Sequence, residues 1–257
     1  MRASRVLKKL RAGEVASCHK INLSCSRVTE IAVMTGFDCV WLDMEHVAND
    51  WATIENQIRA CKLYDVDTIV RMPRGSYSDY IKPLELYAAG IMVPHLMNLE
   101  EARQVVWQTR FHPIGRRPLN GGNPDGAYCM NPVKNYIRQA NQERLIMAQI
   151  EDPETLDDLD EIAKLEGIDM IFFGPGDFSQ AIGSVGQMDH PMITETRKRI
   201  ADVCKTHGKF AGTVGNPGNL QDLVDMGYQF VSVGSDVGAL SEANKKIVSV
   251  FSQLKCN

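Results

Sequence analysis

The chain has 257 residues, of which 44% are hydrophobic and 23% are charged, and its formal net charge is −4. This length suffices for one large core and is typical of a single α/β barrel. The balanced charge argues against nucleic acid as a partner, and no apolar run approaches the roughly 18 residues that cross a membrane, so we expect no membrane partner.

The seven cysteines are spread along the chain without any Cys-x-x-Cys pair. An odd and scattered set argues against a disulfide framework or a zinc knuckle, so we expect free thiols. The basic segment 1–9 lacks the apolar stretch of a secretion signal, and we therefore expect a cytoplasmic location.

Eight short apolar runs recur along the chain, and each is followed by a polar or glycine-containing break. Their apolar residues are continuous, which is typical of parallel strands buried on both faces. In chain order the runs cover residues 15–18, 39–42, 68–70, 91–94, 145–150, 170–173, 210–213 and 230–233. Amphipathic segments such as 98–109 and 153–165 predict helices between them, so the pattern predicts repeated βα units.

Repeated βα units either close into a (β/α)8 barrel or lie open in a doubly wound sheet. Nearly every run ends in a chemically capable side chain. These strand-end residues are Asp43, Glu45, His46, Arg71, His95, Glu151, Asp177, Ser235 and Asp236. In a barrel they would all open onto one face, where active sites lie, so we predict a single barrel domain over residues 1–257.

One connection is longer than the repeat requires, with an excursion between the fourth and fifth runs at about residues 110–140. Gly, Pro and Asn are dense over 111–124, which predicts irregular structure there. A long ordered loop on the working face of a barrel is often a lid or a substrate-binding loop, and the alternative is a contact between subunits.

Glu151 and Asp177 follow neighbouring strands of the predicted barrel, so their carboxylates should face the same cavity. Two such charges repel each other unless something neutralises them. Oxygen ligands with open positions favour Mg²⁺, Mn²⁺ or Co²⁺, and both residues are therefore candidate metal ligands. The alternative for Glu151 is to cap the helix that follows it.

The turn Gly174-Pro175-Gly176 leads into a predicted helix start, where free backbone N–H groups favour an anion such as a carboxylate. Arg71 offers a planar second donor for a carboxylate or a developing enolate oxygen. The alternative for this arginine is a structural ion pair.

His46 ends the acidic stretch Asp43-Met44-Glu45-His46, where a strand gives way to a loop. Histidine is suited to proton transfer near neutral pH, and a carboxylate partner fixes its tautomer and raises its basicity. His46 is therefore a candidate acid and base.

These residues lie in motifs that resemble the HpcH/HpaI-type class II pyruvate aldolases, which include 2-dehydro-3-deoxyglucarate, 2-keto-3-deoxy-rhamnonate and 4-hydroxy-2-oxoheptanedioate aldolases. The resemblance runs from about residue 36 to residue 236. Its ordered motifs are Gly36-Phe37-Asp38 with Trp41-Leu42-Asp43-Met44-Glu45-His46, then Val70-Arg71-Met72-Pro73, Val93-Pro94-His95, Gln149-Ile150-Glu151, Gly174-Pro175-Gly176-Asp177-Phe178-Ser179 and Val233-Gly234-Ser235-Asp236.

The resemblance implies a (β/α)8 barrel of the phosphoenolpyruvate/pyruvate-domain type that cleaves or forms a 4-hydroxy-2-oxo acid through a metal-bound pyruvate enolate. The second product is an aldehyde, and the assembly is a homohexamer in which neighbours exchange a C-terminal helix. The implied roles are metal binding by Glu151 and Asp177, carboxylate binding by the amides of residues 174–177, substrate binding by Gln149, enolate stabilisation by Arg71, and proton transfer by His46 oriented by Asp43.

The sequence departs from this family in three places. Met44 stands where relatives carry glycine, Glu85 and Tyr87 replace the Asp and Gly of an Asp-x-Gly-Ala motif, and Lys20 lies where relatives usually have an aromatic residue nearby. A cationic Lys20 would favour an acidic aldehyde. Lys20, Glu45 and Glu85 are further candidate site residues.

Three alternatives stay open. A lyase for CoA thioesters of the citramalyl-CoA or malyl-CoA type shares the barrel and the metal pair, although the pyruvate-type motifs disfavour it. A Schiff-base aldolase would need Lys20 as its nucleophile. A barrel that binds a 2-oxo acid without turnover would bind metal and pyruvate but would release no product.

Overall fold

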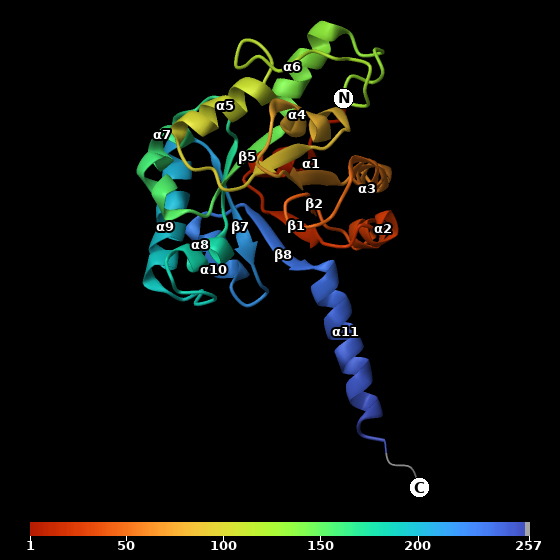
Figure 1. The fold of residues 1–257 in the computed structure, drawn as a ribbon, viewed down its shortest axis with the longest axis vertical. Coiled ribbons are helices and arrows are strands. Elements are labelled where there is room, and N and C mark those ends of the chain that lie inside the picture. The colour runs from red at the N-terminus through yellow and green to blue at the C-terminus, as the bar shows by residue number, and fades with distance from the viewer. Residues whose placement is uncertain (255–257) are drawn as a thin grey trace.

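Eight parallel strands close into a barrel in the computed structural model, which describes residues 1–254 (Figure 1). Each strand pairs with the next, and β8 returns to pair with β1, so an open doubly wound sheet is excluded. The strands are β1 (Ala16–Ile21), β2 (Cys39–Asp43), β3 (Asp67–Arg71), β4 (Gly90–Val93), β5 (Leu145–Ile150), β6 (Met170–Phe173), β7 (Phe210–Gly215) and β8 (Phe230–Ser235). The predicted barrel is confirmed, and each of the eight apolar runs overlaps one strand.

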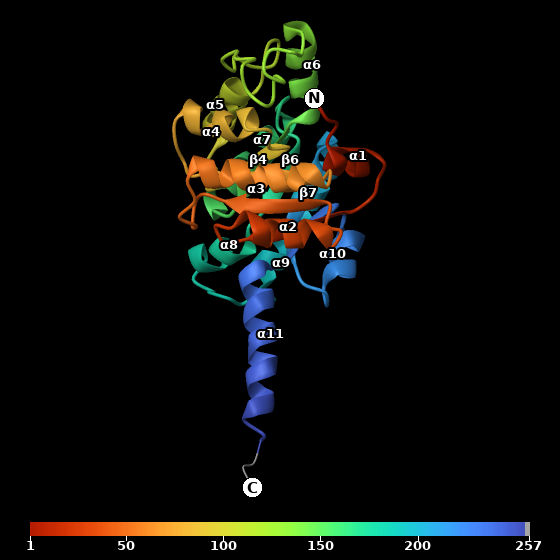
Figure 2. The same cartoon turned by 90° about the vertical axis from the view of Figure 1, so that its right-hand side faces the viewer.

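Helices cover the outside of the barrel, as the two perpendicular views show (Figures 1 and 2). The predicted helix at 98–109 is α5, which begins after Asn98, whose side chain accepts a hydrogen bond from the Glu101 backbone. The segment 153–165 forms the 3-10 helix η1 (Pro153–Asp158) and then α7. The α-helices are α1 (Arg5–Arg11), α2 (Ser26–Met34), α3 (Trp51–Leu63), α4 (Tyr77–Glu85), α5 (Leu99–Thr109), α6 (Val133–Glu143), α7 (Leu159–Lys164), α8 (Pro175–Ala181), α9 (Pro191–His207), α10 (Leu220–Met226) and α11 (Asp236–Phe251).

Large apolar side chains fill the inside of the barrel. Trp41, Ile69, Met147, Phe172 and Phe230 belong to one buried cluster. The rings of Trp41 and Phe172 meet edge to face, with 5.7 Å between their centroids. Because this packing blocks the centre of the barrel, chemistry is confined to the carboxyl ends of the strands.

The excursion between α5 and β5 lies at the opposite end of the barrel. It begins where α5 ends and leads through α6 into the first residue of β5, so it belongs to the amino ends of the strands. The carboxyl group of Asp125 is buried there and lies 2.6 Å from the Arg144 guanidinium and 3.3 Å from that of Arg117. The interpretation of this segment as a lid over the site of its own chain is therefore wrong. The alternative of a contact between subunits stays a prediction.

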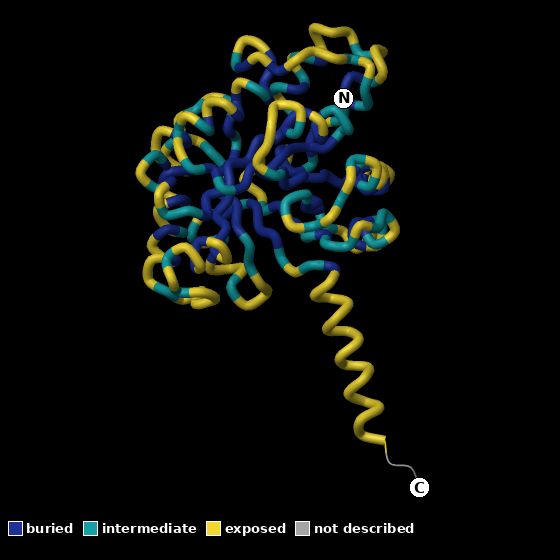
Figure 3. Tube along the Cα trace, viewed as in Figure 1, coloured by how far each residue is buried: buried dark blue, intermediate teal, exposed yellow. Residues whose placement is uncertain are grey.

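The C-terminal helix α11 projects away from the barrel in both views. It is exposed along almost its whole length, as the yellow trace in Figure 3 shows. Its exposed residues include Leu240, Ile247, Val248 and Phe251, the last of these 67% exposed. Exposed apolar side chains gathered on one element in this way are typical of a contact surface.

Within residues 1–254, no helix combines the length and the apolar character needed to cross a lipid bilayer.

Candidate metal and substrate site

Glu151 is the buried centre of the polar cluster at the carboxyl ends of the strands. It follows β5, and its Oε1 accepts a hydrogen bond of 2.9 Å from the backbone N–H of His95. Its other carboxylate oxygen contacts the side-chain amide of Gln149. A Cβ atom on Gly174 would lie 2.6 Å from Glu151 Oε2. The glycine of the predicted anion turn is thus required because the carboxylate packs against the turn.

The charge of Glu151 is poorly compensated. Burial raises the pKa of Glu151 to about 7, and the charges of Asp177 and Glu45 act in the same direction. The backbone amide and the charge of His95 oppose this rise. Desolvation and like charge together disfavour the ionised form, so a cation at this position would relieve both effects.

His95 follows β4 and faces two carboxylates. Its Nε2 lies 3.7 Å from Glu45 Oε1 and 3.7 Å from Glu151 Oε1. Its Nδ1 lies 3.0 Å from Asp152 Oδ2. Although partial burial opposes protonation, the hydrogen bond to Asp152 and the surrounding carboxylates raise the pKa of His95. The ligand atoms of Glu45, His95 and Glu151 lie within 4.8 Å of one another, a grouping that is able to hold a metal ion.

Asp43 and Arg71 end neighbouring strands and are register partners. Arg71 Nε donates to Asp43 Oδ1 at 3.1 Å, and the terminal Nη2 contacts the other oxygen. Lys20 Nζ lies 3.0 Å from the same carboxylate. Burial opposes ionisation, but the hydrogen bonds and charges of Arg71 and Lys20 hold the pKa of Asp43 at about 2. Both cations also lie over the ring of Trp41, at 4.7 and 4.8 Å from its centroid.

The structure does not bring the ring of His46 to the carboxylate of Asp43. Asp43 Oδ1 instead accepts the backbone N–H groups of Glu45 and His46, at 3.0 and 3.3 Å. The His46 side chain is 56% exposed, and its Nε2 lies 3.5 Å from Glu45 Oε2. Asp43 therefore fixes the backbone that carries His46, and Glu45 is the carboxylate beside the ring.

Asp177 lies on the first turn of α8 and is exposed. It is close enough for its charge to raise the pKa of Glu151, but it is not part of the grouping of Glu45, His95 and Glu151. In the turn before it, the Gly174 N–H already donates to the Ile150 carbonyl, and Pro175 has no N–H. The amides of Gly176 and Asp177 are therefore the donors left for an anion.

The structure places Glu85 apart from the other candidate residues. Glu85 ends α4, and its carbonyl accepts the backbone N–H of Asp125 in the excursion. It thus lies at the amino ends of the strands, away from Glu151 in the same chain. Burial raises the pKa of Glu85, while the charge of Arg117 opposes this shift.

Two residues of the site had little signal in the sequence. His95 could be named only as a strand-end histidine, and Asp152 stood beside Glu151 without an assigned role. Their contact joins two loops, one after β4 and one after β5, and such a contact depends on the closed barrel.

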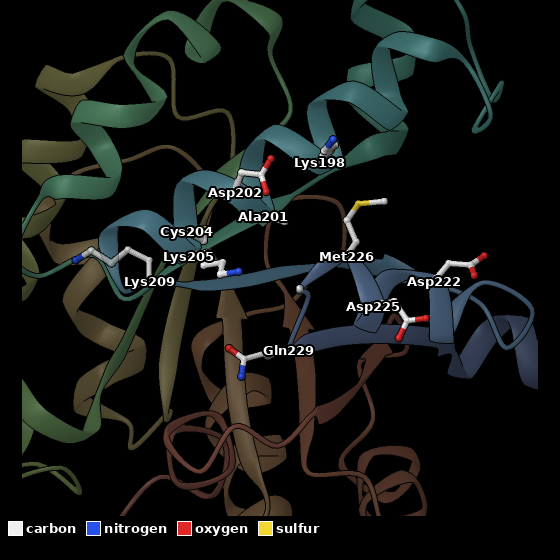
Figure 4. Close-up of a pocket in the computed structure, with 11 residues that line it drawn as sticks. Lys198, Ala201, Asp202, Cys204, Lys205, Lys209, Asp222, Asp225, Met226 and Gln229 are labelled. Carbon is white, nitrogen blue, oxygen red and sulfur yellow. The ribbon is translucent and has the colours of Figure 1, made fainter.

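A separate pocket of about 610 Å³ lies between α9 and α10 (Figure 4). It is lined by charged residues of both signs, including Lys198, Asp202, Lys205 and Asp225. Lys209 and Gln229, which directly precede β7 and β8, also line it, so it lies at the amino ends of the strands. It is not part of the cluster around Glu151.

The fold is a closed parallel barrel, and carboxylates, a histidine and an arginine gather at the carboxyl ends of its strands. These features define a barrel enzyme with a site suited to a divalent cation. Residues 21–243 match the HpcH/HpaI aldolase/citrate lyase family, and the chain belongs to that family.

Named relatives agree with this assignment. The chain is 33% identical to 5-keto-4-deoxy-D-glucarate aldolase of Escherichia coli over 87% of each chain, and 31% identical to 2-keto-3-deoxy-L-rhamnonate aldolase of Escherichia coli over 95% of this chain and 91% of that one. The predicted family and the predicted enzyme class, a carbon–carbon lyase, are confirmed.

Solved structures show the same fold. An HpcH/HpaI aldolase from Desulfitobacterium hafniense is 27% identical, with a TM-score of 0.89 and 97% of each chain covered. The citrate synthase SbnG is 28% identical, with a TM-score of 0.88 and 98% of each chain covered.

Proposed function

We propose that the protein is a divalent-metal-dependent aldolase that cleaves or forms a 4-hydroxy-2-oxo acid, with pyruvate and an aldehyde as the other side of the reaction. The observation that carries this proposal is the buried carboxylate of Glu151, whose pKa is raised to about 7 beside the further carboxylates of Glu45 and Asp177. The family and the sugar-acid aldolases among the relatives support the same reaction class.

The donor atoms fit a hard divalent cation. Glu151 and Asp177 are the proposed ligands, and oxygen donors of this kind suit Mg²⁺, Mn²⁺ or Co²⁺. When bound, the cation supplies Lewis-acid polarisation of the 2-oxo group. The packing of Gly174 and Gln149 against Glu151 supports this role, because both hold the carboxylate in one place.

The remaining donors suit a 2-oxo carboxylate. The amides of Gly176 and Asp177 would bind the carboxylate, and a Cβ atom on Gly176 would meet nothing within 4 Å, so the turn leaves room for a ligand. Arg71 donates from Nε and Nη2 to Asp43, and its Nη1 lies 3.1 Å from Glu45 Oε2 in an ion pair, so both terminal nitrogens keep an N–H for an enolate oxygen. Gln149 Oε1 is buried and lacks a partner among the described residues, which suits a substrate hydroxyl.

His46 would move the proton at the aldol hydroxyl. Its exposed ring is free to reach a substrate, and the Glu45 carboxylate lies beside it. Asp43 would act through the backbone of residues 45 and 46, and as the counter-ion that orients Arg71.

The assembly is part of the proposal. We propose a homohexamer in which neighbours exchange α11, as in the family that the motifs resemble. The exposed apolar side chains of α11 support this arrangement. So does a pocket of about 390 Å³ at the base of the helix, lined by Val28, Ile31, Phe37 and Leu240. A cytoplasmic location also remains proposed, and the six free cysteines of the described chain are usual there.

The proposal is tested by screening 2-keto-3-deoxy sugar acids with Mg²⁺, Mn²⁺ and Co²⁺, with release of pyruvate as the readout. We expect pyruvate release that EDTA abolishes and added cation restores. Glu151→Gln should abolish it, whereas Glu154→Gln, which changes an exposed acid of the same segment, should not. Full activity after exhaustive chelation would contradict the proposed metal dependence.

A second candidate is carbon–carbon bond formation with a CoA thioester, which the likeness to the citrate synthase SbnG favours. An assay with acetyl-CoA and oxaloacetate separates the two. Citrate formation without pyruvate release from any keto acid would replace the first proposal by the second. Binding of Mn²⁺ and pyruvate without turnover in either assay would instead indicate a barrel that only binds 2-oxo acids.

A Schiff-base route is disfavoured because Lys20 is ion-paired with Asp43 and lies over the ring of Trp41. A protonated lysine is not a nucleophile. Treatment with borohydride in the presence of pyruvate should trap no adduct.

A further inference from the structure

The imidazole of His95 faces two carboxylates without a hydrogen bond to either. Nε2 points at Glu45 Oε1 and Glu151 Oε1 from 3.7 Å each. A nitrogen–oxygen hydrogen bond requires about 2.7–3.2 Å, so neither contact is one. The ring nitrogen and the two carboxylates thus face one another without a hydrogen bond between the imidazole and either acid.

The spacing is close to that of ligands around one ion. Oxygen and nitrogen ligands lie about 2.1 Å from a divalent transition metal, so neighbouring ligand atoms are about 3.0–3.4 Å apart in octahedral or tetrahedral geometry. The two distances of 3.7 Å from His95 Nε2 exceed this range by only a few tenths of an ångström, and all three ligand atoms lie within 4.8 Å of one another. Small movements of the Glu45 and Glu151 carboxylates and of the His95 ring would therefore bring them around one ion.

The ring is oriented from behind by Asp152. Nδ1 lies 3.0 Å from Asp152 Oδ2, which leaves Nε2 as the free nitrogen that faces the two acids. Histidines that bind metals are usually held in this way, with the second nitrogen donating to a carboxylate that fixes the tautomer.

The backbone also fixes this position. His95 has φ of +46°, in the left-handed region, and its N–H donates to Glu151 Oε1. Residues other than glycine are rarely held in this region, and those that are cluster at functional sites. The same carboxylate that faces the ring thus also anchors the strained backbone beneath it.

We propose that Nε2 of His95 is a direct ligand of the divalent cation held by Glu151. The Glu45 carboxylate faces the same ion, and Asp152 is the positioning residue that orients the His95 ring. This inference rests on the proposed function, because it requires the protein to bind a divalent cation. It differs from a site of Glu151 and Asp177 alone in having a nitrogen ligand.

A nitrogen ligand changes the order of the protein's affinities for different metal ions. Imidazole suits later transition metals, whereas Mg²⁺ favours oxygen donors, and affinity for a mixed site rises from Mn²⁺ to Co²⁺. We therefore expect the protein to bind Co²⁺ more tightly than Mn²⁺, and Mg²⁺ least tightly of the three.

The test is electron spin echo envelope modulation on protein loaded with Mn²⁺, which detects ¹⁴N bonded to the metal. Wild type should show the modulation of one imidazole nitrogen. His95→Asn should lose it, because asparagine tolerates the left-handed backbone but does not reach the ion. We also expect at least tenfold weaker Mn²⁺ binding. Asp152→Asn should weaken binding about 10–100-fold.

The matched control is His207→Gln. His207 also pairs with an aspartate, Asp160, at 3.2 Å, but it ends α9, at the amino ends of the strands. This variant should keep the ¹⁴N signal and the affinity of wild type.

The inference is overturned if Mn²⁺-loaded wild type shows no ¹⁴N modulation, if the modulation persists in His95→Asn, or if wild type binds no Mn²⁺. The first two results would leave a metal-dependent aldolase intact, provided that EDTA still abolishes pyruvate release. Conversely, a ¹⁴N signal that is lost in His95→Asn, in a protein that releases no pyruvate, would support the inference and count against the aldolase.

Discussion

Asp43 holds two cationic side chains on one buried carboxylate. Arg71 and Lys20 both pair with it, and both lie against the ring of Trp41. The carboxylate therefore decides whether Arg71 is in place for a substrate. Its loss would leave two partly or fully buried cations without a counter-ion, which is far more costly than the loss of a surface pair.

We expect Asp43→Asn to lower the free energy of unfolding by about 3–5 kcal/mol near neutral pH, since breaking a buried pair strands its partners. The folded pKa of about 2 lies below the usual value of 3.8, so the stabilisation is present above about pH 4 and is lost as pH falls toward 2. Urea unfolding of both proteins between pH 7 and pH 3 measures this difference. If the difference in unfolding free energy between the two proteins stayed constant below pH 4, the ionised Asp43 carboxylate would not be its cause. Asp189→Asn on the surface is the control.

Gly174→Ala should displace the carboxylate of Glu151, because the added Cβ would lie 2.6 Å from Oε2 and 2.9 Å from Gln149 Nε2. Gly174 has φ of −100°, so alanine meets no backbone penalty there. We expect unchanged circular dichroism and at least tenfold weaker Mn²⁺ binding by titration calorimetry. Gly176→Ala, with open space around its Cβ, should keep the wild-type affinity. Equal affinities in all three proteins would show that this packing does not position Glu151.

The residue types of the site could be found from the sequence, but their pairings could not. Asp43 and His46 are close in the chain, which predicted a side-chain pair. Strand register instead places Asp43 opposite Arg71, and only the His46 backbone reaches the carboxylate. The role of His95 likewise depends on a contact with Asp152 that joins two separate loops.

A local sequence pattern predicts some elements of the fold better than others. The strands were predictable because each is buried on both faces, so its apolar run is continuous. The excursion was placed at the wrong end of the barrel because its position depends on whether it follows a strand or a helix. It follows the helix α5 and not a strand, and a helix returns the chain to the amino ends of the barrel. The same logic places Glu85, at the end of α4, away from Glu151.

At the same scale, α11 offers a test of the assembly. We expect Ile247→Asp to break the oligomer without unfolding the barrel, because this side chain is 57% exposed in the single chain. Light scattering coupled to size-exclusion chromatography would then show smaller species, while circular dichroism stays unchanged. Asn244→Asp adds the same charge at a polar position of α11 and should preserve the assembly. Retention of the full assembly by Ile247→Asp would remove the support that α11 gives to helix exchange.

On the scale of the whole molecule, the side chains that stabilise the barrel lie apart from those of the proposed site. Apolar side chains fill its centre, a buried ion pair around Asp125 fastens the excursion at one end, and the proposed site lies at the other. The site end gathers several carboxylates, so binding of a cation there should stabilise the entire fold.

Addition of Mn²⁺ should raise the melting temperature of wild type, since a ligand that binds only the folded state adds about 2.7 kcal/mol at a concentration 100 times its dissociation constant. Scanning calorimetry with and without EDTA measures the shift. Glu151→Gln should lose most of it, and Glu154→Gln should keep it. An equal shift in all three proteins would mean that Mn²⁺ stabilises the fold from another place.

The position of Trp41 has an optical consequence. The ammonium of Lys20 and the guanidinium of Arg71 both lie over its indole ring, beneath the proposed substrate site. Of the three tryptophans in the chain, Trp41 is the one that both of these cations contact, while Trp107 is about half exposed. A ligand that draws Arg71 toward itself changes the electric field across this ring. Emission from Trp41 can therefore report occupancy of the site without any added label.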